Sequence, residues 1–367
     1  MLSITENIRK SLKSEGFKDR ILWVDWVRAL AIVAILVIHV SSSYLTDISY
    51  QSNFWLIATF FESLSRFGII AFVMISGYLL LNREYELTDF LSRRLKRVLI
   101  PFILWNFIYI FFKINFQNVL GENYTLFAVL EFIGKAFLDP TIVAIQFWFI
   151  YMIVGLYLVT PIISKWIKNS NDREVEYFLV IWLITLLLGF FSVSFLLENY
   201  LIYFSGFIGY FVLGYYLAKK ESKYLNSRLF GLILFITGTL ITFVGTIYLT
   251  YQTGQLDLTF IQLGDLTPNA FLQATGVFII IKNTDFSSWS VKNWSLNGLI
   301  IKVSLFSYGI YLLNILVLRF FEYFGLLSVN TNPIYNIPIF VFLTLIVSLI
   351  TLMILDKLPG LKYLSGK

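Results

Sequence analysis

Ten stretches of mainly apolar residues, each close to the length of a membrane-spanning helix, make up most of this 367-residue chain. A helix needs roughly 20 apolar residues to cross the hydrocarbon core of a bilayer. Charged residues are only 14% of the chain, against about 25% in a soluble domain, so the sequence excludes a water-soluble fold. We therefore expect an all-α, polytopic integral membrane protein. Its predicted transmembrane helices occupy residues 27–46, 54–81, 98–118, 141–163, 177–197, 200–218, 229–251, 267–282, 297–318 and 333–355.

Lys and Arg residues predict how these helices are oriented. When the N-terminus is placed in the cytoplasm, the outer segments contain only Lys113, Lys135 and Arg319, and Arg66 lies within the second helix. The other 24 of the 28 Lys and Arg residues are then cytoplasmic, as the positive-inside rule requires. The pattern therefore predicts ten transmembrane helices with both termini in the cytoplasm.

This topology gives a simple domain organisation. We expect one membrane domain over residues 23–356, between a cytoplasmic arm, residues 1–22, and a cytoplasmic tail, residues 357–367. The net charge of +6 is explained by basic cytoplasmic loops, so no nucleic-acid partner is expected. A basic face of this kind can bind anionic lipid or the phosphates of a soluble nucleotide. Both possibilities stay open at this point.

The chain has no Cys and a single His, His39, which excludes cysteine chemistry and metal sites built from several imidazoles. His39 lies eleven residues after Arg28 in the first apolar stretch. That spacing places both on one helix face, about 16 Å apart along the axis. An ionisable group inside a bilayer is costly and indicates function, although a buried structural histidine is the alternative. Asp25 could pair with Arg28, and Ser42 and Ser43 could contact His39.

A second intramembrane pair is predicted in the next helix. Glu62 and Arg66 are four residues apart, so they share a helix face, and each would be expensive alone in lipid. They are either part of a substrate site or a structural ion pair.

Four cations cluster at the predicted cytoplasmic end of the third helix. Arginine binds phosphate through two parallel hydrogen bonds, which makes the cluster a candidate phosphate site. Anchoring of the helix at the membrane surface is the alternative. The four residues are Arg93, Arg94, Lys96 and Arg97.

Together these residues resemble acyltransferase family 3, integral membrane enzymes that O-acylate surface glycans and related hydroxylated acceptors. The segment Asp25-x-x-Arg28-x10-His39 is similar to the signature of the family's first helix, whose histidine is held to be catalytic. Arg94-x-x-Arg97 is similar to its cytoplasmic arginine motif. The remaining similarities are Ser76-Gly77 in F-V-M-I-S-G-Y-L-L, Trp148 in Q-F-W-F-I-Y followed by Pro161, the segment 213–218, and Tyr311 and Asn314 in S-Y-G-I-Y-L-L-N.

The resemblance implies a function and a set of site residues. It implies transfer of an acetyl or other short acyl group from acyl-CoA, a donor cosubstrate, to a hydroxyl of a surface or lipid-linked glycan, in a prokaryotic cell membrane. No permanently bound cofactor and no metal are expected, and the oligomeric state stays open. The implied catalytic residues are His39, Arg28 and Asp25. The implied CoA-binding residues are Arg93, Arg94, Lys96, Arg97, Ser76 and Gly77. The candidate acceptor-binding residues are Glu62, Arg66, Ser42, Ser43, Trp148, Tyr311 and Asn314.

Two positions depart from the family pattern. The family often has a histidine where this chain has Asn314, and often has a histidine before the tryptophan, where this chain has Gln146. A proton relay through a second histidine is therefore not available. The alternative function is a proton-coupled transporter or translocator of a lipid-linked glycan or small solute, in which His39 would carry the proton and Glu62 and Arg66 would gate.

Overall fold

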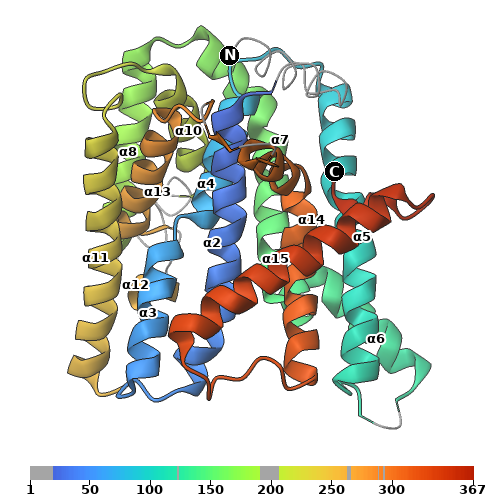
Figure 1. Cartoon of the computed structure of the whole chain (residues 1–367). Coiled ribbons are helices and arrows are strands. Elements are labelled where there is room, and N and C mark those ends of the chain that lie inside the picture. The colour runs from blue at the N-terminus through green and yellow to red at the C-terminus, as the bar shows by residue number, and fades with distance from the viewer. Residues whose placement is uncertain (1–19, 122–123, 191–205, 263–265, 288, 292–293) are drawn as a thin grey trace.

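The computed structural model describes residues 20–121, 124–190, 206–262, 266–287, 289–291 and 294–367. Over these residues the chain is almost entirely helical, which confirms the all-α prediction (Figure 1). The main helices are α2 Leu22–Asp47, α3 Asn53–Ser65, α4 Gly68–Leu80, α5 Leu87–Phe116, α6 Leu126–Leu138, α7 Trp148–Asn169, α8 Asp172–Phe190, α10 Ile208–Lys219, α11 Arg228–Thr253, α13 Pro268–Lys282, α14 Leu296–Tyr323 and α15 Pro333–Lys357. The short elements are η1 Pro140–Ile142, η2 Ile145–Phe147, α12 Thr259–Gln262, η5 Lys362–Ser365 and a two-stranded antiparallel pair, β1 Ser290–Val291 and β2 Trp294–Ser295.

Seven helical segments of the described chain are long and apolar enough to cross a bilayer, so the protein is a multi-pass membrane protein. They are α2, α3 with α4, α5, η2 with α7, α11, α14 and α15. The other three predicted helices, residues 177–197, 200–218 and 267–282, overlap α8, α10 and α13. Residues 191–205 and residues 1–19 of the predicted arm lie outside the described residues. The count of ten and the cytoplasmic location of both termini stay predictions.

The first membrane helix, α2, is the centre of the bundle (Figure 1). It contacts α3, α4, α13, α14 and α15, and most of its side chains are buried. In Figure 1, α15 crosses α2 and α14 obliquely, and both helices do contact α15. The helix that carries Arg28 and His39 is therefore enclosed by protein over much of its surface, which removes these side chains from direct contact with lipid tails.

Close packing of α4 on α10 depends on two glycines that face each other. A Cβ atom on Gly77 would overlap the backbone carbonyl oxygen of Phe211, and one on Gly214 would overlap that of Met74. Small residues of this kind let helix backbones approach in membranes, where there is no hydrophobic driving force between helices. The packing holds α4 in place, and α4 carries part of the site described below.

The segment predicted as a tail, residues 357–367, folds back onto the bundle. Its 3-10 helix η5 contacts α5, α14 and α15. Leu364 and Ser365 are buried, and the indole nitrogen of Trp105 donates a hydrogen bond of 3.0 Å to the carbonyl oxygen of Leu364. This segment therefore closes one side of the bundle between α5 and α14.

Candidate functional site

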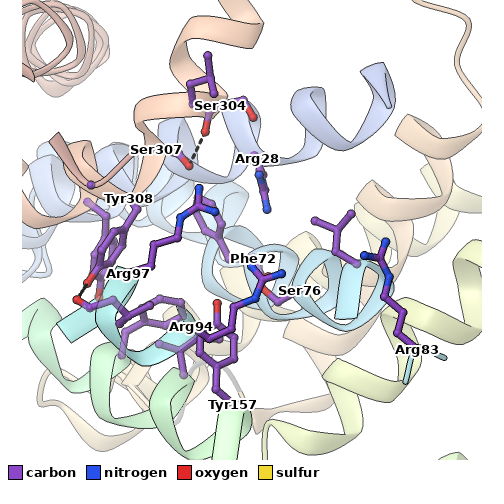
Figure 2. Close-up of a pocket in the computed structure, with 17 residues that line it drawn as sticks. Arg28, Phe72, Ser76, Arg83, Arg94, Arg97, Tyr157, Ser304, Ser307 and Tyr308 are labelled. Atoms are coloured by element: carbon purple, nitrogen blue, oxygen red, sulfur yellow. Dashed lines mark hydrogen bonds between the residues drawn. The ribbon is translucent and has the colours of Figure 1, made fainter. Parts of the chain in front are cut away.

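Four arginine side chains line one cavity of about 320 Å³ near the end of the bundle where α2 begins. Arg28 comes from α2, Arg94 and Arg97 from α5, and Arg83 from the connection between α4 and α5. Figure 2 shows the guanidinium groups of Arg28, Arg94 and Arg97 pointing into the space between the helices. We call this cavity the arginine pocket. Its hydroxyl-bearing walls are Ser76, Tyr157, Ser304, Ser307, Tyr308 and Tyr311.

A wider recess of about 500 Å³ adjoins the arginine pocket, because Arg83, Arg94 and Arg97 line both. Arg93 lines only this outer recess, where its side chain is exposed and pairs with Asp89. Clustered arginines repel one another, so an anion that bridges them is strongly favoured. Together the two spaces can accept a long ligand with several phosphates at its outer end.

Of the four predicted phosphate-binding cations, Lys96 is placed differently. It is exposed, as Arg93 and Arg97 are, but it lines neither the arginine pocket nor the outer recess. Arg94 and Arg97 line both spaces and Arg93 lines the outer one. The helical spacing explains the split. At about 100° per residue, Arg94 and Arg97 lie only about 60° apart around α5, whereas Lys96 lies about 130° from the midpoint between them.

The predicted ion pair between Asp25 and Arg28 does not form, because Asp25 pairs with Arg20 instead. The carboxylate of Asp25 is buried and accepts hydrogen bonds from Arg20 at 2.6 Å and from the Ser304 hydroxyl at 2.5 Å. Arg20 precedes α2 and reaches back to Asp25, whereas no ion pair joins Arg28 to any described residue. The guanidinium of Arg28 thus remains available to a ligand anion in the arginine pocket.

The neighbouring residues Ser76 and Gly77 of α4 have separate roles. Ser76 lines the arginine pocket, and its hydroxyl donates a 2.8 Å bond to the carbonyl oxygen of Phe72. Gly77 is buried against α10, so its contribution is to helix packing. The structure brings the first residue, but not the second, to the pocket.

His39 lines a different cavity, of about 250 Å³, nearer the other end of α2. We call it the histidine pocket. Ser42 and Ser43 line it as well, which brings these predicted neighbours of His39 together. The hydroxyl of Ser42 bonds to the backbone carbonyl oxygen of His39, at 3.1 Å, rather than to the imidazole. The other polar side chains of the pocket are Tyr109, Lys113, Gln117, Thr141, Arg319 and Glu322.

The imidazole of His39 is held by Asn314. Its Nδ1 lies 2.6 Å from the Asn314 side-chain oxygen. The Asn314 side-chain nitrogen donates to the carbonyl oxygens of Ile310, at 3.2 Å, and Tyr311, at 2.6 Å. Because the amide nitrogen is committed to those carbonyls, the amide oxygen faces His39 and accepts a hydrogen bond from the Nδ1–H group. This assignment leaves the lone pair of Nε2 as the basic position of the ring.

A narrow partition separates the two pockets. Tyr311, which lines the arginine pocket, donates its hydroxyl to the backbone carbonyl oxygen of Gln146. The Gln146 side-chain nitrogen donates a 3.2 Å bond to the hydroxyl of Tyr109, which lines the histidine pocket. Tyr109 in turn donates to the carbonyl oxygen of Leu312 at 3.0 Å. A few side chains from α5, η2 and α14 therefore stand between the arginines and the histidine.

Glu62 and Arg66 form an ion pair of 3.0 Å. Glu62 is buried and also accepts a 2.6 Å hydrogen bond from the hydroxyl of Ser41 on α2. Neither Glu62 nor Arg66 lines the arginine pocket or the histidine pocket. Trp148 lines neither as well, and its ring packs on that of Phe207, with centroids 5.7 Å apart. The contacts of Glu62 with Arg66 and with Ser41 match a structural ion pair that ties α3 to α2.

Several residues at these pockets were not singled out from the sequence. Arg83 and Tyr157 line the arginine pocket, and Lys113 and Arg319 line the histidine pocket. A sequence signal did exist for Lys113 and Arg319, because they are two of only three cations in the predicted outer segments. Among the described residues, no group of three or more His, Asp and Glu side chains could hold a metal ion.

One of three comparisons with known proteins identifies a family. A family model described as an acyltransferase domain matches residues 21–353, nearly the whole chain, and it includes every residue of both pockets except Gly366. No curated protein and no solved structure gives a significant match. The resemblance inferred from the motifs is confirmed, and it favours acyl transfer over transport. The chain belongs to the acyltransferase 3 family and is a multi-pass membrane acyltransferase.

Proposed function

We propose that the protein transfers an acetyl or other short acyl group from acyl-CoA to a hydroxyl of a surface or lipid-linked glycan, with His39 as the catalytic base. One observation carries the proposal. A single helix, α2, presents Arg28 to a pocket rich in arginine and His39 to a second pocket, with a thin partition of side chains between them. Such an arrangement suits a donor and an acceptor that arrive from opposite sides.

The donor fits the arginine pocket and its outer recess. CoA carries phosphates at one end and a thioester at the end of a narrow arm. In our proposal Arg83, Arg94 and Arg97 bind the phosphates in the recess, since arginines recognise phosphate oxygens in pairs. The arm then occupies the arginine pocket beside Arg28, with the thioester directed at Tyr311. We place this end of the bundle in the cytoplasm, where the positive-inside rule puts it.

The acceptor fits the histidine pocket. A further cavity of about 330 Å³ shares Ser43, Arg319 and Glu322 with it, so a saccharide longer than one ring has room. An acceptor hydroxyl next to Nε2 of His39 would be in reach of the lone pair that the Asn314 contact leaves available.

The chemistry requires one base and one thioester. Nε2 of His39 takes the proton of the acceptor hydroxyl while the oxygen attacks the thioester carbonyl carbon. The C–S bond then breaks, the thiolate of CoA leaves, and the proton on Nε2 passes to the sulfur. The products are an ester on the acceptor and free CoA. A transient acyl-imidazole on Nε2 is the two-step form of the same transfer.

The partition must open for the thioester to reach His39. On the side of the arginine pocket, the partition is closed by the hydrogen bond from the Tyr311 hydroxyl to the Gln146 carbonyl oxygen, which joins α14 to η2. In our proposal the side chains of Tyr311, Gln146 and Tyr109 turn aside together to join the two pockets, which requires no helix to unwind. Arrival of the thioester there would also exclude water from the reaction.

Two labels on the donor test the proposed function. Proteoliposomes that contain the protein are incubated with a hydroxylated acceptor and acetyl-CoA. The acetyl-CoA is labelled either in its acetyl group or in its adenine. We expect the acetyl label, and not the adenine label, to appear as a base-labile ester on a hydroxylated acceptor. Movement of the acceptor across the bilayer with no acetyl label on it would contradict the proposal and favour the translocator.

A further inference from the structure

Two cations, Lys113 and Arg319, line the histidine pocket, and only one carboxylate lines it with them. Lys113 lies in the last turn of α5, is half-buried, and makes no ion pair with any described residue. Arg319 of α14 bonds to Glu322 at 2.6 Å. Lys113 and Arg319 are close enough for their positive charges to repel each other. With one carboxylate for two cations, the charged side chains that line the histidine pocket carry a net positive charge.

The cost of this arrangement indicates a ligand. Lys113 is half-buried, and holding its charge near that of the exposed Arg319 is unfavourable unless an anion neutralises the two. Topology does not explain the two cations, because the positive-inside rule predicts few cations at this end of the helices. Two of the three cations predicted for the outer segments nevertheless meet at the one pocket that contains His39.

We propose that the acceptor carries a phosphate or a carboxylate next to the hydroxyl that is acylated, and that Lys113 and Arg319 bind this anion. The inference rests on the proposed function and narrows its acceptor to anionic saccharides. Ser43 also lines the pocket and can donate a hydrogen bond to a remaining oxygen of the anion. The hydroxyl of Thr141 donates to Asp139, so it can accept a hydrogen bond from a sugar hydroxyl. An anion fixed there would direct the neighbouring hydroxyl at His39.

Binding of small anionic sugars tests the proposal. The purified full chain is kept in neutral detergent with saturating CoA, so that the arginine pocket is filled. The shift of its thermal unfolding midpoint is then measured with glucose 1-phosphate, with glucuronate and with the neutral methyl glucoside. We expect at least one anionic sugar, and not methyl glucoside, to stabilise the protein, because only a ligand of the folded state raises the midpoint.

The chain provides a matched control for the variants. Lys113→Gln removes one positive charge from the pocket and should weaken the apparent affinity for the anionic sugar by about tenfold or more. Lys135→Gln removes the same charge from α6, where Lys135 is exposed and pairs with Glu131 at 2.6 Å outside the pocket. We expect this control to leave the affinity unchanged. Lys113→Arg keeps the charge and should retain binding, which separates loss of the site from loss of folding.

Each outcome decides the question. Stabilisation by glucose 1-phosphate alone identifies a phosphorylated acceptor, and stabilisation by glucuronate alone identifies a carboxylated one. Equal effects of Lys113→Gln and Lys135→Gln, or equal stabilisation by methyl glucoside, would overturn the inference. Stabilisation that depends on Lys113 but comes only from added phosphatidylglycerol would show a lipid headgroup site and would also overturn it. The proposed function fails separately, if the wild-type protein transfers no acetyl label from acetyl-CoA to any acceptor.

Discussion

Nδ1 of His39 and the side-chain oxygen of Asn314 lie 2.6 Å apart, although the two residues are 275 positions apart in the sequence. The contact joins α2 to α14 in the middle of the bundle. Since the Asn314 amide nitrogen is bonded to two backbone carbonyls of its own helix, the amide cannot turn without losing both bonds. Asn314 therefore fixes both the tautomer and the orientation of the imidazole, since the hydrogen bond made by one ring nitrogen sets the role of the other.

Replacement of Asn314 by Leu tests this positioning role. The variant keeps a side chain of similar size but removes the acceptor of the Nδ1 proton, so the ring can turn and Nε2 can carry the proton instead. We expect kcat to fall on the order of 10²-fold, with KM for acyl-CoA unchanged, because the donor pocket is not touched. Steady-state kinetics with labelled acetyl-CoA measure both quantities.

The conservative variant separates positioning from packing. Asn314→Asp keeps an oxygen that accepts from Nδ1, so it should retain much more activity than Asn314→Leu. Equal kcat values for both variants and the wild type would show that the contact with Asn314 plays no part in the reaction.

Arg97 and Lys96 are neighbours in sequence, but we expect only Arg97 to contribute to acyl-CoA binding. Both residues are exposed, but Arg97 lines the arginine pocket and the outer recess, whereas Lys96 lines neither. Arg97→Gln should weaken acyl-CoA binding by about tenfold or more, through loss of charge-assisted bonds to phosphate. Lys96→Gln should change the affinity for acyl-CoA less than about twofold, since Lys96 lies outside both spaces and an exposed charge that contacts no ligand contributes little. Equilibrium binding of labelled acyl-CoA gives both values, and equal losses would remove Arg97 from the donor site.

Gly77 and Ser76 provide a second neighbouring pair. Gly77→Ala should destabilise the protein by about 1–3 kcal/mol or prevent assembly, because the added methyl group overlaps the backbone of Phe211. Ser76→Ala should leave the unfolding midpoint unchanged and alter only the affinity for acyl-CoA. Thermal unfolding in detergent and donor binding are measured on the same preparations. A Gly77→Ala protein with normal stability and impaired donor binding would instead assign Gly77 to the site.

The ion pair between Glu62 and Arg66 should behave as a structural element. Glu62→Leu alone leaves the positive charge of Arg66 without this carboxylate inside the bundle, and we expect a loss of about 3–5 kcal/mol of stability. The double variant Glu62→Leu/Arg66→Met should recover most of it and keep acyl transfer. Normal stability but no transfer in the double variant would place the pair in the catalytic machinery.

Much of the fold follows from the apolar pattern. Spans such as residues 27–46 and 297–318 are read from length and hydropathy, and α2 and α14 correspond to them. Helical periodicity also predicts that Ser42 and Ser43 lie near His39, since contacts within one helix depend only on local geometry.

Contacts between distant helices could not be predicted in the same way. The His39–Asn314 bond depends on how α2 packs against α14, and nothing in the local sequence encodes that register. The partner of Asp25 was wrong for a related reason: Arg20 precedes α2, so the spacing of residues within the helix does not point to it. The roles of Ser76 and Gly77 could not be separated until the position of α10 was known.

The most direct test of the central claim is the rate of acetyl transfer in a His39→Gln variant. Purified wild-type and variant proteins are reconstituted, acetyl-CoA binding is measured first, and the transfer of the acetyl label is then followed in a single turnover. The account predicts unchanged affinity for acetyl-CoA and a transfer rate lower by about 10²–10⁴-fold. Transfer at the wild-type rate in the His39→Gln protein would contradict it.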